Sequence, residues 1–156
     1  MAEPFDVLVR GGIVVTGAGM ARADVGIRGE QVAAVGPDLP AEGAKRVLDA
    51  TGKLVLPGAV DVHVHPVYLD DIRQSSISAA FGGTTTLIHY AYARPGEKVL
   101  DKIKQFRDDG LANSLTDFGL HAGLFDVANQ IAELPEAFKL GVTSFKVFMT
   151  YAKLKW

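Results

Sequence analysis

The sequence predicts a mixed α/β protein in which a small N-terminal β-sandwich layer precedes the first half of a (β/α)8, TIM-like barrel. Three observations carry this prediction: short strands broken by glycine in residues 1–53, a strand-and-helix repeat from Leu54 onward, and two histidines at alternate positions of the first repeat. We therefore expect two parts, an N-terminal β layer at 1–53 and an incomplete barrel at 54–156.

The N-terminal part has the pattern of β structure with almost no helix. Apolar and polar residues alternate in short runs, and glycine-containing turns separate the runs. Four turns are expected, at 11–12, 17–19, 28–29 and 36–37. The expected strands are 7–9, 13–16, 24–27, 31–35 and 46–49.

A different period begins at Leu54. Strand-like runs start near Leu54, Thr84, Asp117 and Ser144, at spacings of 30, 33 and 27 residues, which is the size of a βα unit. The intervening stretches predict helices, and Gly141 suits the C-terminal cap of the last one. These helices are expected at 69–81, 97–111 and 126–140.

Four βα repeats are half of a (β/α)8 barrel, so the first and last strands would have no neighbour on one side. We expect the remaining barrel half, in the same chain or in a companion chain, to cover these edges. An open four-stranded α/β sheet, complete in itself, is the alternative. It is disfavoured because such a sheet usually carries a glycine-rich phosphate loop, and the sequence contains none.

Composition narrows the classes of function. The 156 residues are 48% hydrophobic and 22% charged, with a net charge of −2, as in a soluble globular protein without a basic surface for nucleic acid. No signal peptide or membrane-length apolar run is apparent, so a cytoplasmic protein is expected. Because there is no cysteine, a metal would need histidine, carboxylate, carbonyl or a modified side chain as its ligands.

His63 and His65 follow an apolar run and alternate with valine. In a strand, residues two apart lie on one face with Cα atoms about 6–7 Å apart, so both imidazoles can bind one cation. Alone, such a pair is as often incidental polar surface as a metal site. Lys146, in the segment 144–151, would by itself be a solvated lysine near a strand end.

Taken together, the segments 57–65 and 141–151 resemble the amidohydrolase superfamily, in its dihydropyrimidinase/hydantoinase branch. The segments 82–85 and 117–121 extend the resemblance, which covers most of the chain but only the N-terminal portion of such an enzyme. It implies a metal-dependent hydrolase that opens small cyclic amides and is commonly a homo-oligomer. A non-catalytic scaffold of the same fold, or a truncated chain without independent activity, are the alternatives.

The resemblance also implies roles for individual residues. His63 and His65 would bind one of two divalent metal ions, expected to be zinc, and Lys146 would bridge both as a CO2-derived carbamate. Tyr151 would donate a hydrogen bond to the developing oxyanion. Asp61 would act as an outer acceptor that orients a metal-bound histidine, or belong to a polar layer of the barrel floor.

Other features of the family pattern are different or missing. His121 matches a family position without being a ligand. Two further histidine ligands and an aspartate base, expected from later strands, have no counterpart in this chain, so the isolated chain is expected to be inactive. His89, expected at the end of the second parallel strand, replaces an acidic residue, and Pro66 follows the histidine pair directly. Both departures bear on which ring is opened.

Overall fold

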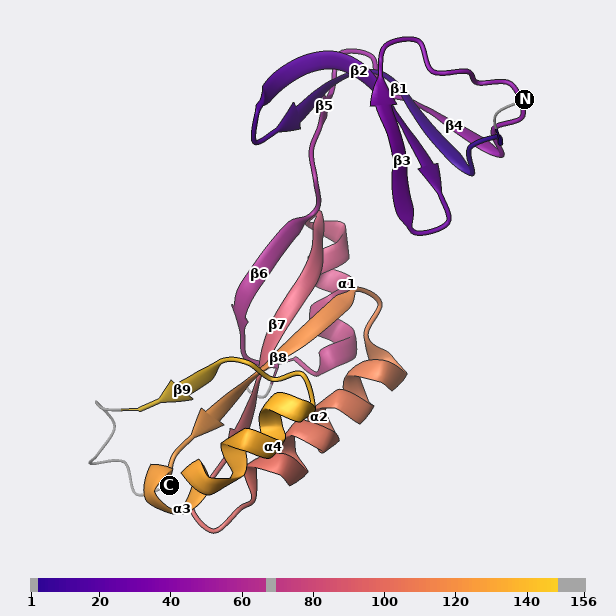
Figure 1. The fold of residues 1–156 in the computed structure, drawn as a ribbon. Helices are drawn as coiled ribbons and strands as arrows, with labels where there is room; N and C mark the ends of the chain where they lie inside the picture. Colours follow the sequence, from indigo (N-terminus) through magenta and orange to yellow (C-terminus); the bar gives the residue numbers. More distant parts are fainter. Residues whose placement is uncertain (1–2, 67–69, 149–156) are drawn as a thin grey trace. The chain divides into compact units, whose positions relative to one another are not determined.

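The computed structural model describes residues 3–66 and 70–148, and the chain divides into two compact units, Met1–Pro57 and Gly58–Trp156. Figure 1 shows a β unit followed by a unit of parallel strands and helices. Within the described residues, no helix combines the length and the apolar character needed to cross a bilayer.

The first unit is a five-stranded sheet with the order β3-β2-β1-β4, and β5 also pairs with β1. The β1–β2 and β2–β3 pairs are antiparallel, whereas β4 and β5 run parallel to β1. The strands are β1 (Val7–Thr16), β2 (Gly19–Arg28), β3 (Gln31–Gly36), β4 (Arg46–Asp49) and β5 (Leu54–Val55).

Two expectations for this unit were wrong. The turn predicted at Gly11-Gly12 is a register shift inside one continuous strand, where the Gly11 N–H donates to the buried Asp24 carboxylate at 2.8 Å. Leu54 and Val55, expected to open the first barrel strand, instead pair with Ile13 and Val14 of β1. Both errors concern partners that are distant in the sequence.

The second unit is a parallel four-stranded sheet with the order β6-β7-β8-β9, which confirms the predicted βα alternation. Along the chain its elements are β6 (Ala59–Val64), α1 (Ile72–Phe81), β7 (Thr84–Ala93), α2 (Val99–Asn113), β8 (Asp117–Leu124), α3 (Val127–Gln130), the 3-10 helix η1 (Ile131–Glu133), α4 (Leu134–Lys139) and β9 (Phe145–Val147).

The core of this unit lies between the sheet and one layer of helices. In Figure 1, α1, α2 and α4 lie on the same side of the sheet. The buried cluster consists of Ala91, Ala93, Val99, Ile103, Ala122, Leu124, Ala137 and Val142. A doubly wound sheet would have helices on both faces. One-sided covering, with β6 and β9 as edges, is the arrangement of half a barrel.

The expected third helix is broken into three pieces. Pro135 lies near the start of α4, and proline lacks the N–H that would continue the hydrogen bonding of the preceding turn. The C-terminal prediction was correct: α4 ends at Lys139, and Gly141 has a φ of 87°, which glycine adopts without strain.

The start of α1 gives a testable prediction. Asp71 is its N-cap and accepts a hydrogen bond from the Gln74 N–H at 2.7 Å. Asp71→Ala should lower the free energy of unfolding by about 1 kcal/mol, because one helix N–H loses its acceptor. Denaturant unfolding measures this loss. Asp71→Asn, which keeps an acceptor, should lose less, and equal losses would contradict the cap.

Candidate functional site

His63 lies on β6, and His65 directly follows the last residue of that strand, Val64. Their ring centroids are 4.8 Å apart, with the ring planes at 77°. Tyr90 of β7 contacts both rings, at 4.8 Å from His63 and 5.0 Å from His65. His63 is exposed and His65 is half-buried. The two imidazoles therefore share one face of the sheet, as the alternating pattern predicted.

Lys146 of β9 reaches the same place from the opposite edge of the sheet. Its Nζ lies 3.2 Å from Nε2 of His63 and 4.7 Å from the Tyr90 ring centroid. The second aromatic neighbour is Phe148, at 5.0 Å. No carboxylate of the described residues forms an ion pair with Lys146. The lysine thus faces the His63 imidazole and two aromatic rings, with no carboxylate partner in the described part of the chain.

Tyr92 of β7 orients His65, a contact that the sequence analysis missed. Its hydroxyl lies 2.5 Å from Nδ1 of His65. If Nδ1–H donates to the tyrosine oxygen, the lone pair of Nε2 stays available for a metal. Tyr90 and Tyr92 are two residues apart on the neighbouring strand, so their alternation was the available signal.

The protonation of His65 also suits a ligand. Burial lowers the pKa of its imidazole, and the nearby positive charges of His63 and Lys146 lower it further. A neutral imidazole is the form that binds a metal. Near neutral pH, His65 is thus prepared to act as a ligand without first losing a proton.

Asp61 and His121 contact the backbone of β6 beside the two histidines. Asp61 Oδ1 accepts the His63 backbone N–H at 3.0 Å, and His121 Nε2 donates to the Val62 carbonyl at 3.0 Å. The other ring nitrogen of His121 forms a hydrogen bond with Ser144 Oγ. These contacts hold the main chain rather than an imidazole.

His89 does not belong to this cluster. It lies in the middle of β7, not at its end as the sequence suggested, and its side chain is fully buried. Its ring lies 6.5 Å from that of Phe118. Neither of its ring nitrogens has a hydrogen-bond partner within residues 3–66 and 70–148.

The described part of the chain contains no group of three or more histidine, cysteine, aspartate or glutamate side chains able to hold a metal ion. The structure brings together His63, His65 and Lys146, but they include only two such side chains. Tyr151, expected at the same site, lies outside the described residues. A complete metal centre would therefore need ligands in addition to these histidines.

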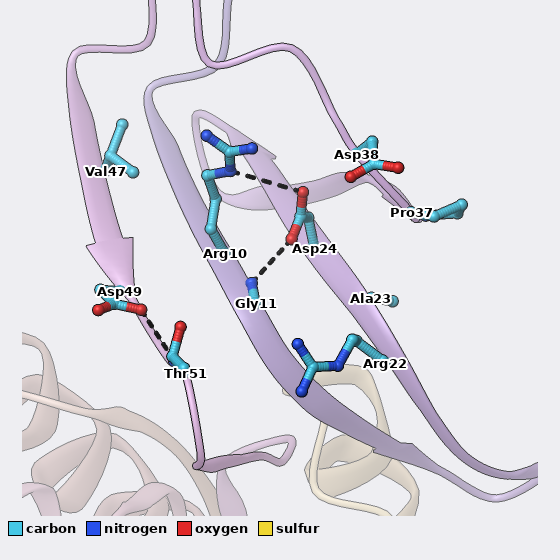
Figure 2. Close-up of a pocket in the computed structure, with 10 residues that line it drawn as sticks. All are labelled: Arg10, Gly11, Arg22, Ala23, Asp24, Pro37, Asp38, Val47, Asp49 and Thr51. Carbon is cyan, nitrogen blue, oxygen red and sulfur yellow. Dashed lines mark hydrogen bonds and ion pairs between the residues drawn. The ribbon is translucent and has the colours of Figure 1, made fainter.

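A separate hollow of about 550 Å³ lies in the first unit (Figure 2). Asp24, 6% exposed, accepts hydrogen bonds from the N–H groups of Gly11 and Leu39, and Arg10 approaches it at 3.8 Å. These contacts satisfy its charge, so Asp24 has a structural role in the sheet. We assign no function to this hollow.

No family model matches the sequence, but individual relatives do. The chain is 35% identical over 153 residues to a D-hydantoinase of Geobacillus stearothermophilus, covering 92% of this chain and 32% of the relative. It is 34% identical over 167 residues to the dihydropyrimidinase of Rattus norvegicus, covering 99% of this chain and 32% of the relative. The chain thus spans about one third of the length of these relatives.

A solved structure agrees with the sequence matches. The dihydropyrimidinase from Brevibacillus agri NCHU1002 superposes with a TM-score of 0.86 at 34% identity, over 94% of this chain and 34% of that chain. A high score over nearly the whole chain means that both units have counterparts in the relative.

Proposed function

Because this chain is homologous to hydantoinases and dihydropyrimidinases over nearly its whole length, we propose that it carries part of the active site of a metal-dependent hydrolase of cyclic amides. The observation that supports this most directly is the meeting of His63, His65 and Lys146 on one face of the parallel sheet. A scaffold without catalysis would not need all three residues.

The residues fit a metal centre in their chemistry. His63 and His65 would bind one divalent ion through their imidazoles, and Tyr92 holds His65 in the orientation described above. When bound, paired divalent ions acidify a water molecule and polarise a carbonyl oxygen, which is the chemistry needed to open a cyclic amide. Zinc is the ion that we propose.

Lys146 would take part only after modification. A protonated ammonium has no lone pair, whereas the neutral amine attacks the carbon of CO2, loses a proton to solvent and becomes an anionic carbamate. The two oxygens of the carbamate would serve as metal ligands. Nζ lies beside the aromatic rings of Tyr90 and Phe148, and no carboxylate of the described residues pairs with it.

The remaining parts of the reaction are proposed from the family resemblance. Tyr151 would donate a hydrogen bond to the oxyanion of the tetrahedral intermediate. Two further histidines and an aspartate base would come from the remaining barrel half. With only part of the ligand set, the 156-residue chain should bind metal weakly and turn over little cyclic amide by itself.

Native mass spectrometry tests this proposal. In bicarbonate buffer with excess Zn²⁺, the chain should gain the mass of one CO2 together with bound zinc. Lys146→Met should abolish the CO2 adduct. The matched control is Lys139→Met, on the exposed surface of α4, which should keep the adduct. Wild-type protein that takes up neither zinc nor CO2 under these conditions would overturn the proposal.

A further inference from the structure

The strand that carries His63 and leads directly into His65 contains an extra residue. Three steps along β6, from Asp61 to Val64, match two steps along β7, from Leu87 to His89. Such a β-bulge leaves backbone groups outside the regular ladder and changes the direction of nearby side chains. The strict alternation assumed from Asp61 to His65 is therefore interrupted between Asp61 and Val64.

Side chains satisfy two backbone groups of this bulge. The His63 N–H donates to Asp61 Oδ1, and the Val62 carbonyl accepts from His121 Nε2, each at 3.0 Å. The first contact is local, within two residues. The second spans 59 residues and comes from β8, which is not a neighbour of β6 in the sheet. His121 thus reaches across β7, with its ring 4.9 Å from that of Tyr90.

The other end of the His121 ring is tied to the opposite edge of the sheet. Nδ1 forms a hydrogen bond with Oγ of Ser144, which directly precedes β9 and lies two residues before Lys146. The main chain of Ser144 is also fixed, because its carbonyl accepts the Ala122 N–H at 3.1 Å. One imidazole therefore connects the histidine-bearing bulge to the start of the lysine-bearing strand.

We propose that His121 is a positioning residue that sets the distance between the His63 imidazole and Lys146. This inference rests on the proposed function, because the distance matters for metal binding. A carbonyl only accepts, so Nε2 must carry the hydrogen; in the neutral ring Nδ1 then accepts the Ser144 hydroxyl proton. His121 acts through the main chain and is not itself a ligand.

The chain has only four histidines, so NMR of the imidazole rings can test the proposal directly. In the metal-free chain, ¹⁵N spectra should show a hydrogen on Nε2 of His121. During a Zn²⁺ titration, the His63 and His65 signals should shift while that of His121 keeps its tautomer. A His121 signal with hydrogen on Nδ1 alone would overturn the proposal without reference to metal.

Three variants separate positioning from folding. His121→Leu removes both hydrogen bonds and should weaken Zn²⁺ binding by about 10- to 100-fold, as expected when an outer partner of a metal site is lost. His121→Gln, which can still donate to the Val62 carbonyl, should recover most of that loss. Ser144→Ala removes only one of the two hydrogen bonds and should weaken Zn²⁺ binding less than His121→Leu does. It tests the same contact if His121→Leu does not fold.

The two proposals fail in different ways. If His121→Leu and Ser144→Ala both bound Zn²⁺ with the same affinity as the wild-type chain, the role of His121 would be overturned. The proposed function would remain intact. Equal losses in His121→Gln and His121→Leu would also overturn it, because the donor to Val62 would then be irrelevant. Failure of wild-type protein to bind Zn²⁺ would overturn the proposed function and the positioning role with it.

Discussion

Replacing His63 by alanine should reduce the Zn²⁺ affinity of the chain more than loss of the His121 hydrogen bonds does. Loss of an outer hydrogen-bond partner typically weakens a metal site by about 10- to 100-fold, and loss of a direct ligand should exceed this. His63 is exposed, so the fold should survive the substitution. Nζ of Lys146, which lies 3.2 Å from Nε2 of His63, would lose this hydrogen-bond partner.

Isothermal titration calorimetry with Zn²⁺ measures this effect, and thermal unfolding reports on the fold. Val60→Ala is the matched control, because Val60 lies on the same strand, is 57% exposed and has no metal-binding atom. It should bind Zn²⁺ as the wild type does. If His63→Ala also bound as the wild type does, the paired imidazoles would not form the proposed metal site.

The sequence predicted the repeating architecture well because its signals are local. Buried parallel strands and amphipathic helices differ in period, and Gly141 marked a helix end through its own backbone freedom. The errors came from non-local partners. The Gly11-Gly12 pair is typical of a turn, but in the structure the Gly11 N–H donates to the carboxylate of Asp24, 13 residues away. Similarly, nothing near Leu54 indicates that it pairs with Ile13.

The candidate site was predictable in part for the same reason. Alternation predicted that His63 and His65 share one face, and their rings do lie together although a bulge interrupts the alternation. Lys146 is 83 residues from His63, and only a family resemblance associated them. The contact of His121 with the Val62 carbonyl occurs at a bulge of β6. No spacing in the sequence encodes a bulge, because the register of two strands fixes it.

His89→Leu should raise the free energy of unfolding by about 1–3 kcal/mol. The imidazole is fully buried, and neither nitrogen has a hydrogen-bond partner in the described part of the chain. A buried polar group without a partner loses its contacts with water and gains nothing in return, so a leucine side chain of similar size removes that cost. In the sequence, His89 stands out only as a departure from an acidic family position.

The same substitution should change how stability depends on pH. Burial lowers the pKa of His89, although the carboxylates of Asp109 and Asp61 act to raise it. Below its ordinary pKa of about 6.5, the imidazole binds a proton in the unfolded chain, whereas the buried imidazole of the folded chain stays neutral until the pH is lower. Wild-type stability should therefore fall as the pH decreases from about 6.5 towards the folded pKa, by up to about 1.4 kcal/mol per pH unit from this group.

Denaturant unfolding of both proteins between about pH 7 and pH 5 isolates this contribution as a difference. The lowered pKa of His65 acts in the same direction but is present in both proteins, so it cancels. The stability advantage of His89→Leu should thus grow as the pH falls. His89→Gln, which keeps a buried polar group, should show no such initial advantage. If His89→Leu were no more stable than the wild type, or if its extra stability decreased as the pH fell, the His89 imidazole would have a hydrogen-bond partner in solution. Only a buried ring without a partner explains both a more stable variant and a difference that grows in acid.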